Sequence, residues 1–234
     1  MPLKSAARVA GSVLARFLTP AVVGDVVDHG PALRTIILTT PKPADWTPGD
    51  MVRIAVRDLS LRTYTPLSVE GGAMRILAHL AGSGPGSEWC ARAETGQECR
   101  ILRQKSIDLR KHVPAPVVVG DETSLGLYVA QCATVADPPA GVFEVDDADA
   151  AAAALGHHTS RPASFVTRQP EDRHLDELGA TVVDLLTSQA DTTLCLTGRA
   201  QTIAALRRRL KDTGHAGRTA AVKAYWDINR SGLD

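Results

Sequence analysis

The chain has 234 residues, a length that suits one large domain or two small ones. Hydrophobic residues make up 44% and charged residues 22% of it, as in an ordinary globular protein. The 26 Lys and Arg balance the 26 Asp and Glu, and this zero formal net charge excludes a general binder of nucleic acid or of an anionic membrane.

Residues 4–18 form a moderately apolar N-terminal stretch that Arg8 and Arg16 interrupt. This stretch lacks the continuous apolar core of a signal peptide, and no part of the chain approaches the roughly 18 apolar residues of a membrane-spanning helix. We therefore expect a cytoplasmic protein without a membrane span.

The first half of the chain, up to about Gln104, predicts short strands separated by turns. Turn residues recur between the apolar runs, for example at Gly30-Pro31, Pro48-Gly49 and Gly71-Gly72. The predicted strands are 21–27, 33–39, 50–56, 62–69, 75–79 and 98–102. Strands at this spacing predict an antiparallel six-stranded β-barrel, a shape that removes exposed sheet edges.

The second half, from about Pro114, alternates strands with helices. The predicted strands are 117–119, 142–145, 164–167, 193–197 and 220–224, and the predicted helices are 125–133, 148–155, 175–188 and 201–210. This alternation predicts an α/β domain with a five-stranded parallel sheet, in which ligands bind at the carboxyl ends of the strands. We place the barrel domain at residues 15–107 and the α/β domain at residues 114–234, with a ligand groove between them.

The predicted barrel strand 62–69 carries the first candidate binding residues, Arg62-Thr63-Tyr64-Thr65. Arg62 and Tyr64 share one face of a strand, where the guanidinium suits a phosphate and the phenol ring suits a flat ring system. Pro66 restricts Thr65 to extended geometry, so that its hydroxyl or amide can approach a ring nitrogen. The alternative is an exposed Arg beside a Tyr that packs in the barrel.

A second candidate group follows the fifth predicted strand. His79 precedes a glycine-containing turn and a helix that begins at about Pro85 and ends near residue 93. The glycines allow close approach of a ligand, and the helix N-terminus offers unpaired amides to an anion. The residues concerned are His79, Gly84, Gly86, Ser87 and Trp89. The alternative is a loop and a capped helix with Trp89 in the core.

The third group is Gly120-Asp121-Glu122-Thr123, after the first predicted parallel strand. A dinucleotide fold holds its glycine-rich phosphate loop here, whereas two carboxylates would repel a pyrophosphate. The carboxylates and hydroxyls suit a carboxamide or a sugar, or they cap the following helix.

The remaining candidates lie near the C-terminus. Gly198 permits close approach after the fourth parallel strand, and Arg199 is placed to meet a nucleotide phosphate. Trp226 lies close to the end of the chain, where it either docks on the body of the protein or covers a flat ligand.

The cysteines and the paired histidines indicate no metal site. Cys90, Cys99, Cys132 and Cys195 form no CxxC pair, which favours reduced thiols in a cytosolic protein. Neighbouring side chains at His157-His158 point in different directions, so a metal there needs ligands from elsewhere and a solvated loop is the preferred interpretation.

Together these motifs resemble one family, the siderophore-interacting proteins, which are FAD-dependent ferric-siderophore reductases of the ferredoxin-reductase-like class. Arg62 to Thr65 resembles the flavin-binding strand. The segment from His79 to Trp89, the segment from Gly120 to Thr123 and the 224–226 segment with Trp226 follow in the order of the family. The resemblance covers most of the chain from about residue 15.

The resemblance implies FAD on the barrel, NADPH or NADH on the second domain, and a ferric siderophore as the electron acceptor. It places Arg62 at the pyrophosphate of FAD, Tyr64 against the flavin and Thr65 near flavin N5. It places His79, Gly86 and Ser87 on the phosphate or adenosine side, with Trp89 supporting the helix that follows Gly84, and it includes Thr63 of the flavin-binding strand. Gly120, Asp121, Glu122, Thr123, Gly198 and Arg199 would serve the nicotinamide nucleotide, and Trp226 would lie near the flavin.

The chain departs from the family pattern at Leu102 to Lys105, at Gly126-Leu127, at Arg199 and in the tail 227–230. Arg199 would favour NADPH by meeting its 2′-phosphate, or it marks a branch with another donor. These departures keep two alternatives open, a flavin reductase that serves another small-molecule or protein acceptor and a non-enzymatic flavin-binding module. In each case we expect a monomer or a weak dimer.

Overall fold

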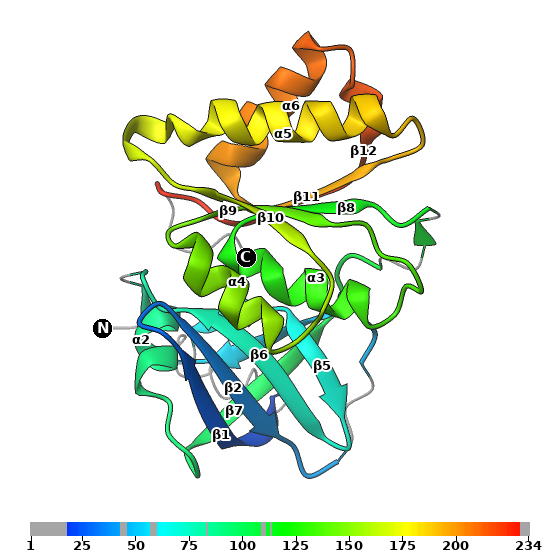
Figure 1. Cartoon of the computed structure of the whole chain (residues 1–234). Coiled ribbons are helices and arrows are strands. Elements are labelled where there is room, and N and C mark those ends of the chain that lie inside the picture. The colour runs from blue at the N-terminus through cyan, green and yellow to red at the C-terminus, as the bar shows by residue number, and fades with distance from the viewer. Residues whose placement is uncertain are drawn as a thin grey trace, which may run out of the picture.

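The computed structural model describes residues 18–42, 46–56, 60–82, 84–108, 111–112 and 114–229. An antiparallel barrel is followed by an α/β unit that lies against it (Figure 1). This arrangement confirms the predicted fold class. The predicted domain boundaries stay a prediction, and residues 4–17 and 230–234, on which some of the expectations fall, lie outside the described residues.

The barrel strands appear in the predicted order. They are β1 (Thr19–His29), β2 (Leu33–Thr39), β3 (Met51–Ala55), β4 (Leu61–Tyr64), β5 (Pro66–Glu70), β6 (Ala73–His79) and β7 (Glu98–Gln104). The spatial order is β4-β3-β7-β1-β2-β6-β5, and every pair is antiparallel.

The predicted strand 62–69 is two strands, because the ladder breaks at Thr65. β4 pairs with β3 on one side, whereas β5 pairs with β6 on the other. The two outer strands of the sheet order are thus consecutive in the chain, and the sheet closes on itself through Thr65. Pro66 cannot donate a backbone hydrogen bond, and a register shift follows it in β5. The barrel therefore has seven strands in place of the six expected.

Alternating apolar side chains fill the barrel, among them Val23, Ile36, Ile54 and Ile76. Helix α2 (Pro85–Arg92) packs on this core through Cys90.

Arg34 of β2 ties α2 to the barrel. Its guanidinium donates to the carbonyl oxygens of Cys90 (3.1 Å) and Ala91 (2.8 Å) and pairs with Asp28. These carbonyls belong to the last turn of α2, where helical acceptors lack regular partners, and the Cys90 carbonyl also accepts from the Ala93 amide (3.4 Å).

The α/β unit contains five parallel strands and four helices. The strands are β8 (Val117–Gly120), β9 (Gly141–Val145), β10 (Ala163–Thr167), β11 (Leu194–Arg199) and β12 (Thr219–Trp226). The helices are α3 (Leu125–Cys132), α4 (Ala148–Gly156), α5 (His174–Ser188) and α6 (Ala200–Asp212), with short turns η2 (Glu122–Ser124), η3 (Pro170–Asp172) and η4 (Ala216–Arg218). The strand order β10-β9-β8-β11-β12 reverses between β8 and β11, where such sheets bind ligands.

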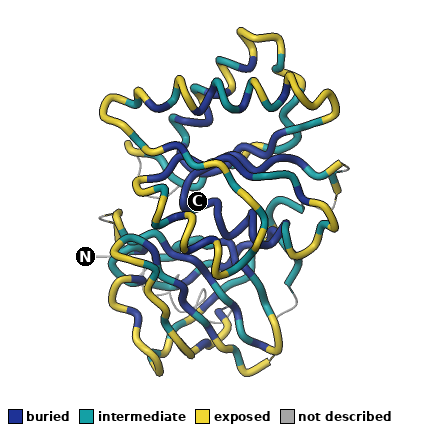
Figure 2. The backbone as a smooth tube through the Cα atoms, viewed as in Figure 1, coloured by how far each residue is buried: buried dark blue, intermediate teal, exposed yellow. Residues whose placement is uncertain are grey.

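Helices α3 and α4 lie between the sheet and the barrel, and α5 and α6 cover the other face (Figure 1). Leu33, Leu67 and Leu77 on the outside of the barrel join one hydrophobic cluster with Leu127 and Tyr128 of α3. Figure 2 shows the buried backbone concentrated in the sheet and continuing toward the barrel. The two units therefore share a core, which fixes their relative placement.

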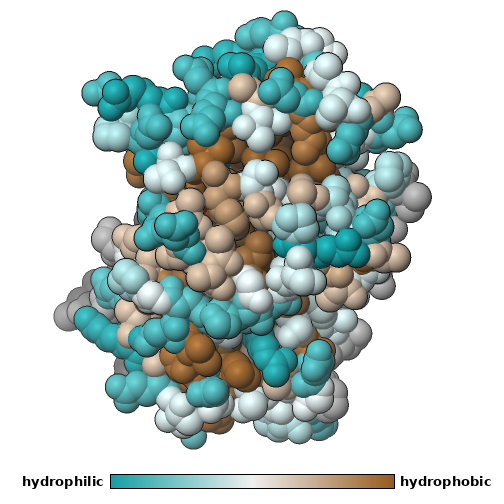
Figure 3. Space-filling model, viewed as in Figure 1, coloured by the Kyte–Doolittle hydropathy of each residue, from teal (hydrophilic) through white to brown (hydrophobic). Residues whose placement is uncertain are grey.

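The outer layer presents a different surface. Hydrophilic residues dominate the upper part of the face in Figure 3, and hydrophobic ones gather beneath them. This agrees with α6, which buries Ile203, Leu206 and Leu210 and leaves Arg207 and Arg208 exposed. Among the described residues, no helix has the length and apolar character needed to cross a membrane.

The close approach of α3 to the barrel requires Gly126. A Cβ at this position would lie under 3.0 Å from the backbone carbonyl oxygen of Thr65, so Gly126→Ala forces the two units apart. We expect a loss of about 1–3 kcal/mol in the free energy of unfolding, measured by urea denaturation. Gly156→Ala is the matched control, because a Cβ there meets nothing within 4 Å and stability should hold or rise slightly. Equal stability of both variants would contradict the interpretation.

Candidate functional site

The first two candidate groups meet at the start of α2. A Cβ on Gly86 would lie 2.8 Å from the Tyr64 hydroxyl and 3.1 Å from Cγ of Arg62, so the helix N-terminus rests directly on β4. The Tyr64 hydroxyl accepts a hydrogen bond from Cys90 Sγ (3.2 Å), and burial raises the pKa of Tyr64 well above its usual value. The phosphate-binding features predicted from two separate motifs are therefore neighbours.

The N-terminus of α2 is open to an anion. Gly84 is its N-cap and supplies no side-chain hydrogen bond, and Pro85 occupies the first turn. Ser87 Oγ donates to the carbonyl oxygen of His79 (3.4 Å), which joins the helix to β6. The Arg62 guanidinium donates to Ser60 Oγ (2.7 Å) and to the Leu61 carbonyl (2.8 Å) beside this end.

A hollow of about 200 Å³ lies beside α2 and is lined by Val56, Pro85, Glu88, Trp89, Arg92 and Gln97. Trp89 also packs against the barrel core, as the alternative interpretation of this residue expects. The indole has one side in the core and borders an open hollow.

Thr65 marks the junction of barrel and sheet. Its side chain is buried, and its hydroxyl has no hydrogen-bond partner. The Tyr225 hydroxyl is buried without a partner as well, and Tyr225 lies near both Thr65 and Thr197. Burial raises the pKa of Tyr225, which keeps the phenol neutral. The two hydroxyls thus lie close together between the units and interact with each other without full hydrogen-bond geometry, so that a polar ring placed beside them would bond to both.

Asp121 anchors the turn after β8. Its carboxylate is fully buried and accepts hydrogen bonds from the Thr123 backbone amide (2.9 Å), the Thr123 hydroxyl and the Trp226 indole Nε1 (2.7 Å). Burial raises the pKa of Asp121 to about 6, although the bonds from Thr123 and Trp226 act in the opposite direction. Gly198, with φ of +92°, passes directly beside this carboxylate. The capping function expected as the alternative for this turn is present, and Trp226 docks on it.

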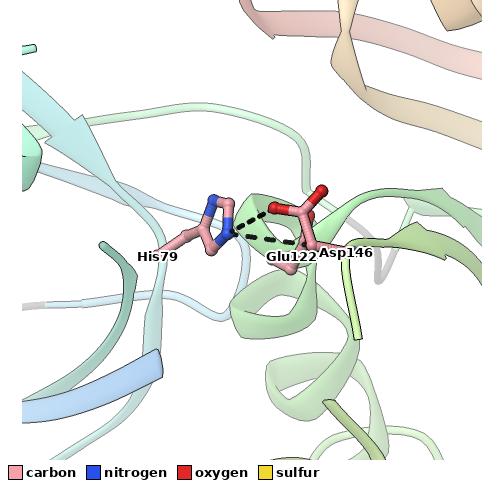
Figure 4. A group of neighbouring side chains, drawn as sticks. All are labelled: His79, Glu122 and Asp146. Atoms are coloured by element: carbon pink, nitrogen blue, oxygen red, sulfur yellow. Dashed lines mark hydrogen bonds and ion pairs between the residues drawn. The ribbon is translucent and has the colours of Figure 1, made fainter. Parts of the chain in front are cut away.

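His79, Glu122 and Asp146 form a charged cluster between the two units (Figure 4). The His79 Nε2 atom lies 3.3 Å from Asp146 Oδ2 and 3.8 Å from Glu122 Oε1. Arg168 donates to Glu122 Oε2 (2.6 Å) and to Asp146 Oδ1 (2.6 Å). The His79 side chain thus points toward the α/β unit.

Arg199 does not face the groove as a free cation. Its two terminal nitrogens donate to the two carboxylate oxygens of Asp172 at 2.7 Å each, and the side chain is 6% exposed. Asp172 and Glu171 both have positive φ, near +60°, which is unusual outside glycine. A phosphate would have to displace Asp172 in order to reach Arg199.

Sequence reasoning missed three residues of this region, namely Asp146, Arg168 and Tyr225. Asp146 and Arg168 follow β9 and β10 directly, at the strand ends where ligands are expected, so their positions were available as a signal. Tyr225 belongs to the 224–226 motif, in which a site role was assigned to Trp226 alone. The structure brings together Arg62, Tyr64 and Gly86, then Asp121, Gly198 and Trp226, and it leaves Arg199 apart on Asp172.

The residues present fit a flavin. Arg62 beside an uncapped helix N-terminus suits a pyrophosphate, and the unsatisfied Thr65 hydroxyl at the strand break suits a ring nitrogen. The nucleotide side fits less well, because Asp121 and Glu122 occupy the phosphate position and Arg199 is neutralised by Asp172.

The fold is that of siderophore-interacting proteins and ferredoxin reductases. A siderophore-interacting protein from Acinetobacter baumannii shares 14% identity with a TM-score of 0.74, and 92% of each chain is covered. A siderophore utilization protein from T. fusca shares 18% identity with a TM-score of 0.67, covering 93% of this chain and 95% of that one. A ferredoxin NADP+ reductase from Neisseria gonorrhoeae with bound FAD and NADP shares 16% identity with a TM-score of 0.68, covering 90% and 99%.

In sequence, no protein-family model matches the chain, and no curated protein does so either. The structural likeness therefore confirms the fold expected from the resemblance.

The buried carboxyl group of Asp121 makes stability depend on pH. Its pKa rises from 3.8 to about 6 on folding, so its contribution is fully present below pH 3.8 and is lost as the pH rises through 6. Between pH 4 and pH 8 the free energy of unfolding should fall by about 2–3 kcal/mol relative to Asp121→Asn, measured by urea denaturation.

The same titration should appear in the Trp226 indole resonance by NMR, with a midpoint near pH 6 that Asp121→Asn removes. The Trp46 indole donates to the backbone carbonyl of Asp50 and serves as the internal control that stays constant over this range. A Trp226 resonance that does not move between pH 4 and pH 8 would contradict the burial argument.

Proposed function

We propose that the protein is an FAD-dependent oxidoreductase that passes electrons from NADPH or NADH to the iron(III) of a siderophore, so that iron(II) is released. The observation that carries this proposal is the pair of buried, unsatisfied hydroxyls of Thr65 and Tyr225 beside the Arg62–Tyr64 strand. When bound, FAD accepts a hydride from the nicotinamide and gives up electrons singly to the metal.

The chain contributes binding and orientation. Arg62 and the amides at Gly86 and Ser87 would hold the pyrophosphate, since charge-assisted and helix-terminal donors both favour an anion. Tyr64 would lie against the ring system and the Thr65 hydroxyl near N5. The His79 carbonyl, already joined to Ser87, would support the phosphate side of the site.

The nicotinamide nucleotide would enter at the carboxyl ends of β8 and β11. Thr123, Gly198 and Trp226 line this side, and Asp121 fixes the indole of Trp226 by its hydrogen bond. Arg168 neutralises Glu122 and Asp146 at the same edge, which lowers the repulsion that two carboxylates would exert on a pyrophosphate. Arg199 would bind a 2′-phosphate only after that phosphate displaces Asp172 from its guanidinium.

The neighbours in fold support the two levels of this proposal. The likeness to a reductase with bound FAD and NADP supports an oxidoreductase, and the likeness to siderophore-interacting proteins supports the ferric siderophore as the acceptor. Reduction of the iron weakens its binding to the siderophore, because hard oxygen ligands hold iron(III) better than iron(II). The four cysteines are free, in keeping with a reducing cytoplasm, and a monomer or weak dimer stays our expectation.

The proposal is tested by the absorption spectrum of the purified protein. We expect a flavin spectrum, its anaerobic bleaching by NADPH or NADH, and its return on addition of a ferric siderophore with formation of iron(II). A colourless protein that cannot be reconstituted with FAD would overturn the proposal. Bleaching without iron reduction would indicate a flavin reductase with another acceptor, and flavin that neither nucleotide bleaches would indicate a non-enzymatic module.

Arg62→Ala tests the pyrophosphate site. Loss of charge-assisted contacts worth about 1.5–3 kcal/mol should weaken FAD binding roughly ten- to a hundredfold, measured by titration of the apoprotein with FAD. Arg207→Ala is the matched control, because Arg207 is exposed on α6, on the far side of the sheet from the barrel. Unchanged FAD affinity in Arg62→Ala would remove this residue from the site.

A further inference from the structure

Three side chains from both units converge on one point, at the edge of the sheet where the proposed nicotinamide site lies. His79 ends β6 of the barrel, Glu122 lies in η2 after β8, and Asp146 follows β9. Their ligand atoms all lie within 4.8 Å of one another. Figure 4 shows the imidazole directed at the two carboxylates from the opposite side.

The spacing matches a tetrahedral metal ion. Two ligands that each lie about 2.0–2.1 Å from zinc are about 3.4 Å apart in a tetrahedral site. The distances from His79 Nε2 are 3.3 Å to Asp146 Oδ2 and 3.8 Å to Glu122 Oε1. An ion between the three atoms therefore requires only small side-chain movements.

The state of His79 points to a missing partner. Its Nε2 atom is buried and has no hydrogen-bond partner, although it is aimed at two carboxylate oxygens. One imidazole nitrogen and two carboxylate oxygens form a mixed donor set that zinc accepts, with a fourth position left for water. We propose that His79, Glu122 and Asp146 bind a zinc-class divalent cation between the barrel and the parallel sheet.

Arg168 sets the strength of this site. Its guanidinium holds Glu122 Oε2 and Asp146 Oδ1 and also reaches Glu122 Oε1 at 3.0 Å. It thereby orients the carboxylates so that Asp146 Oδ2 faces His79, and it offsets one of their two negative charges. With neutral imidazole one negative charge remains, so the cation binds reversibly and less tightly than at a site built from thiolates.

A cation bound at this site would contact both structural units. One ligand comes from the barrel and two from the α/β unit, and the backbone amide of Asp146 fixes Glu122 Oε1 at 2.7 Å. Binding would join the two units across their groove. We therefore expect zinc to raise the melting temperature of the protein as well as to bind it.

A second group of histidines provides the comparison site. His29 of β1 lies against His157 and His158, with ring centroids 5.0 and 5.7 Å away, and Thr35 bridges the Nε2 atoms of His29 and His158. A metal at His157-His158 needs ligands from elsewhere in the chain, and His29 supplies one neighbour. The Thr35 hydroxyl satisfies two of the three rings, in contrast to His79, whose Nε2 atom has ion-pair contacts but no hydrogen bond.

The experiment is calorimetric titration of the chelator-treated full-length protein with zinc chloride. We expect one equivalent bound at this site and a loss of affinity of roughly tenfold or more in both His79→Ala and Asp146→Asn. His157→Ala is the matched control and should bind as the unchanged protein does. Asp146 is exposed and its substitution conservative, so this variant keeps the test valid if His79→Ala fails to fold.

Three results would overturn the proposal: no zinc binding by the unchanged protein, full affinity in both site variants, or loss of affinity in His157→Ala with His79→Ala unaffected. This inference goes beyond the proposed function and does not depend on it. The flavin spectrum of the same samples separates the two, since a yellow protein without zinc binding refutes only the metal site, and a colourless protein that binds zinc refutes only the flavin.

Discussion

The packing of α3 against the barrel is the constraint on which the rest of the structure depends. This helix is buried on nearly all sides, because the parallel sheet covers one face and the barrel the other. Gly126 lets its backbone approach Thr65, and Leu67 and Leu77 of the barrel pack on the same layer. Every candidate residue in the groove takes its position from this contact, because the barrel and sheet would otherwise vary in their relative placement.

The zero net charge of the chain reflects compensation at short range. Arg168 pairs with Glu122 and Asp146, and Arg199 pairs with Asp172. A phosphate or a cation that approaches these residues must therefore compete with an existing partner. This competition gives selectivity, because a weakly charged ligand gains too little from the arginine or from the carboxylate to break the ion pair between them.

The pattern of apolar and polar residues along the sequence was enough to predict most helices and strands and their order along the chain. Alternation in 33–39 and the apolar run 117–119 predicted β2 and β8 because both patterns follow from which faces are covered. The break at Thr65 escaped prediction, although Pro66 marked it, because the closure of a barrel depends on pairing between strands far apart in the chain. Propensity along one segment carries no information on such pairing.

The sequence indicated where the candidate residues lie along the strands, but not which side chains they pair with. Strand ends and glycine turns pointed to Arg62, Asp121 and Gly198, and the structure places Arg62 beside Gly86 and Asp121 beside Gly198. The pairing of Arg199 with Asp172 could not be foreseen, because it depends on η3, where two non-glycine residues adopt positive φ. Arg168 went unnoticed for the same reason, since its role comes from two carboxylates on other strands.

Two buried polar groups on opposite faces of the sheet differ in how completely they are hydrogen-bonded. On the α5 side, Glu144 is fully buried, yet its oxygens bond to His174 (2.6 Å) and Thr202 (2.7 Å). On the barrel side, the hydroxyls of Thr65 and Tyr225 interact with each other, but neither meets a partner at full hydrogen-bond geometry. An unpaired buried polar group costs about 1–3 kcal/mol.

This contrast bears on what the groove holds. Gln131, Arg168 and Arg199 each have one unpaired buried atom, but they bond through their other nitrogens. Thr65 and Tyr225 have only one polar side-chain atom each, so the cost falls on the whole group. The buried carboxylate of Glu144 is thus fully hydrogen-bonded on one face of the sheet. On the other face, the hydroxyls of Thr65 and Tyr225 are available to bond to a ligand. The groove between barrel and sheet is therefore the place where a bound ring would stabilise the fold as well as take part in chemistry.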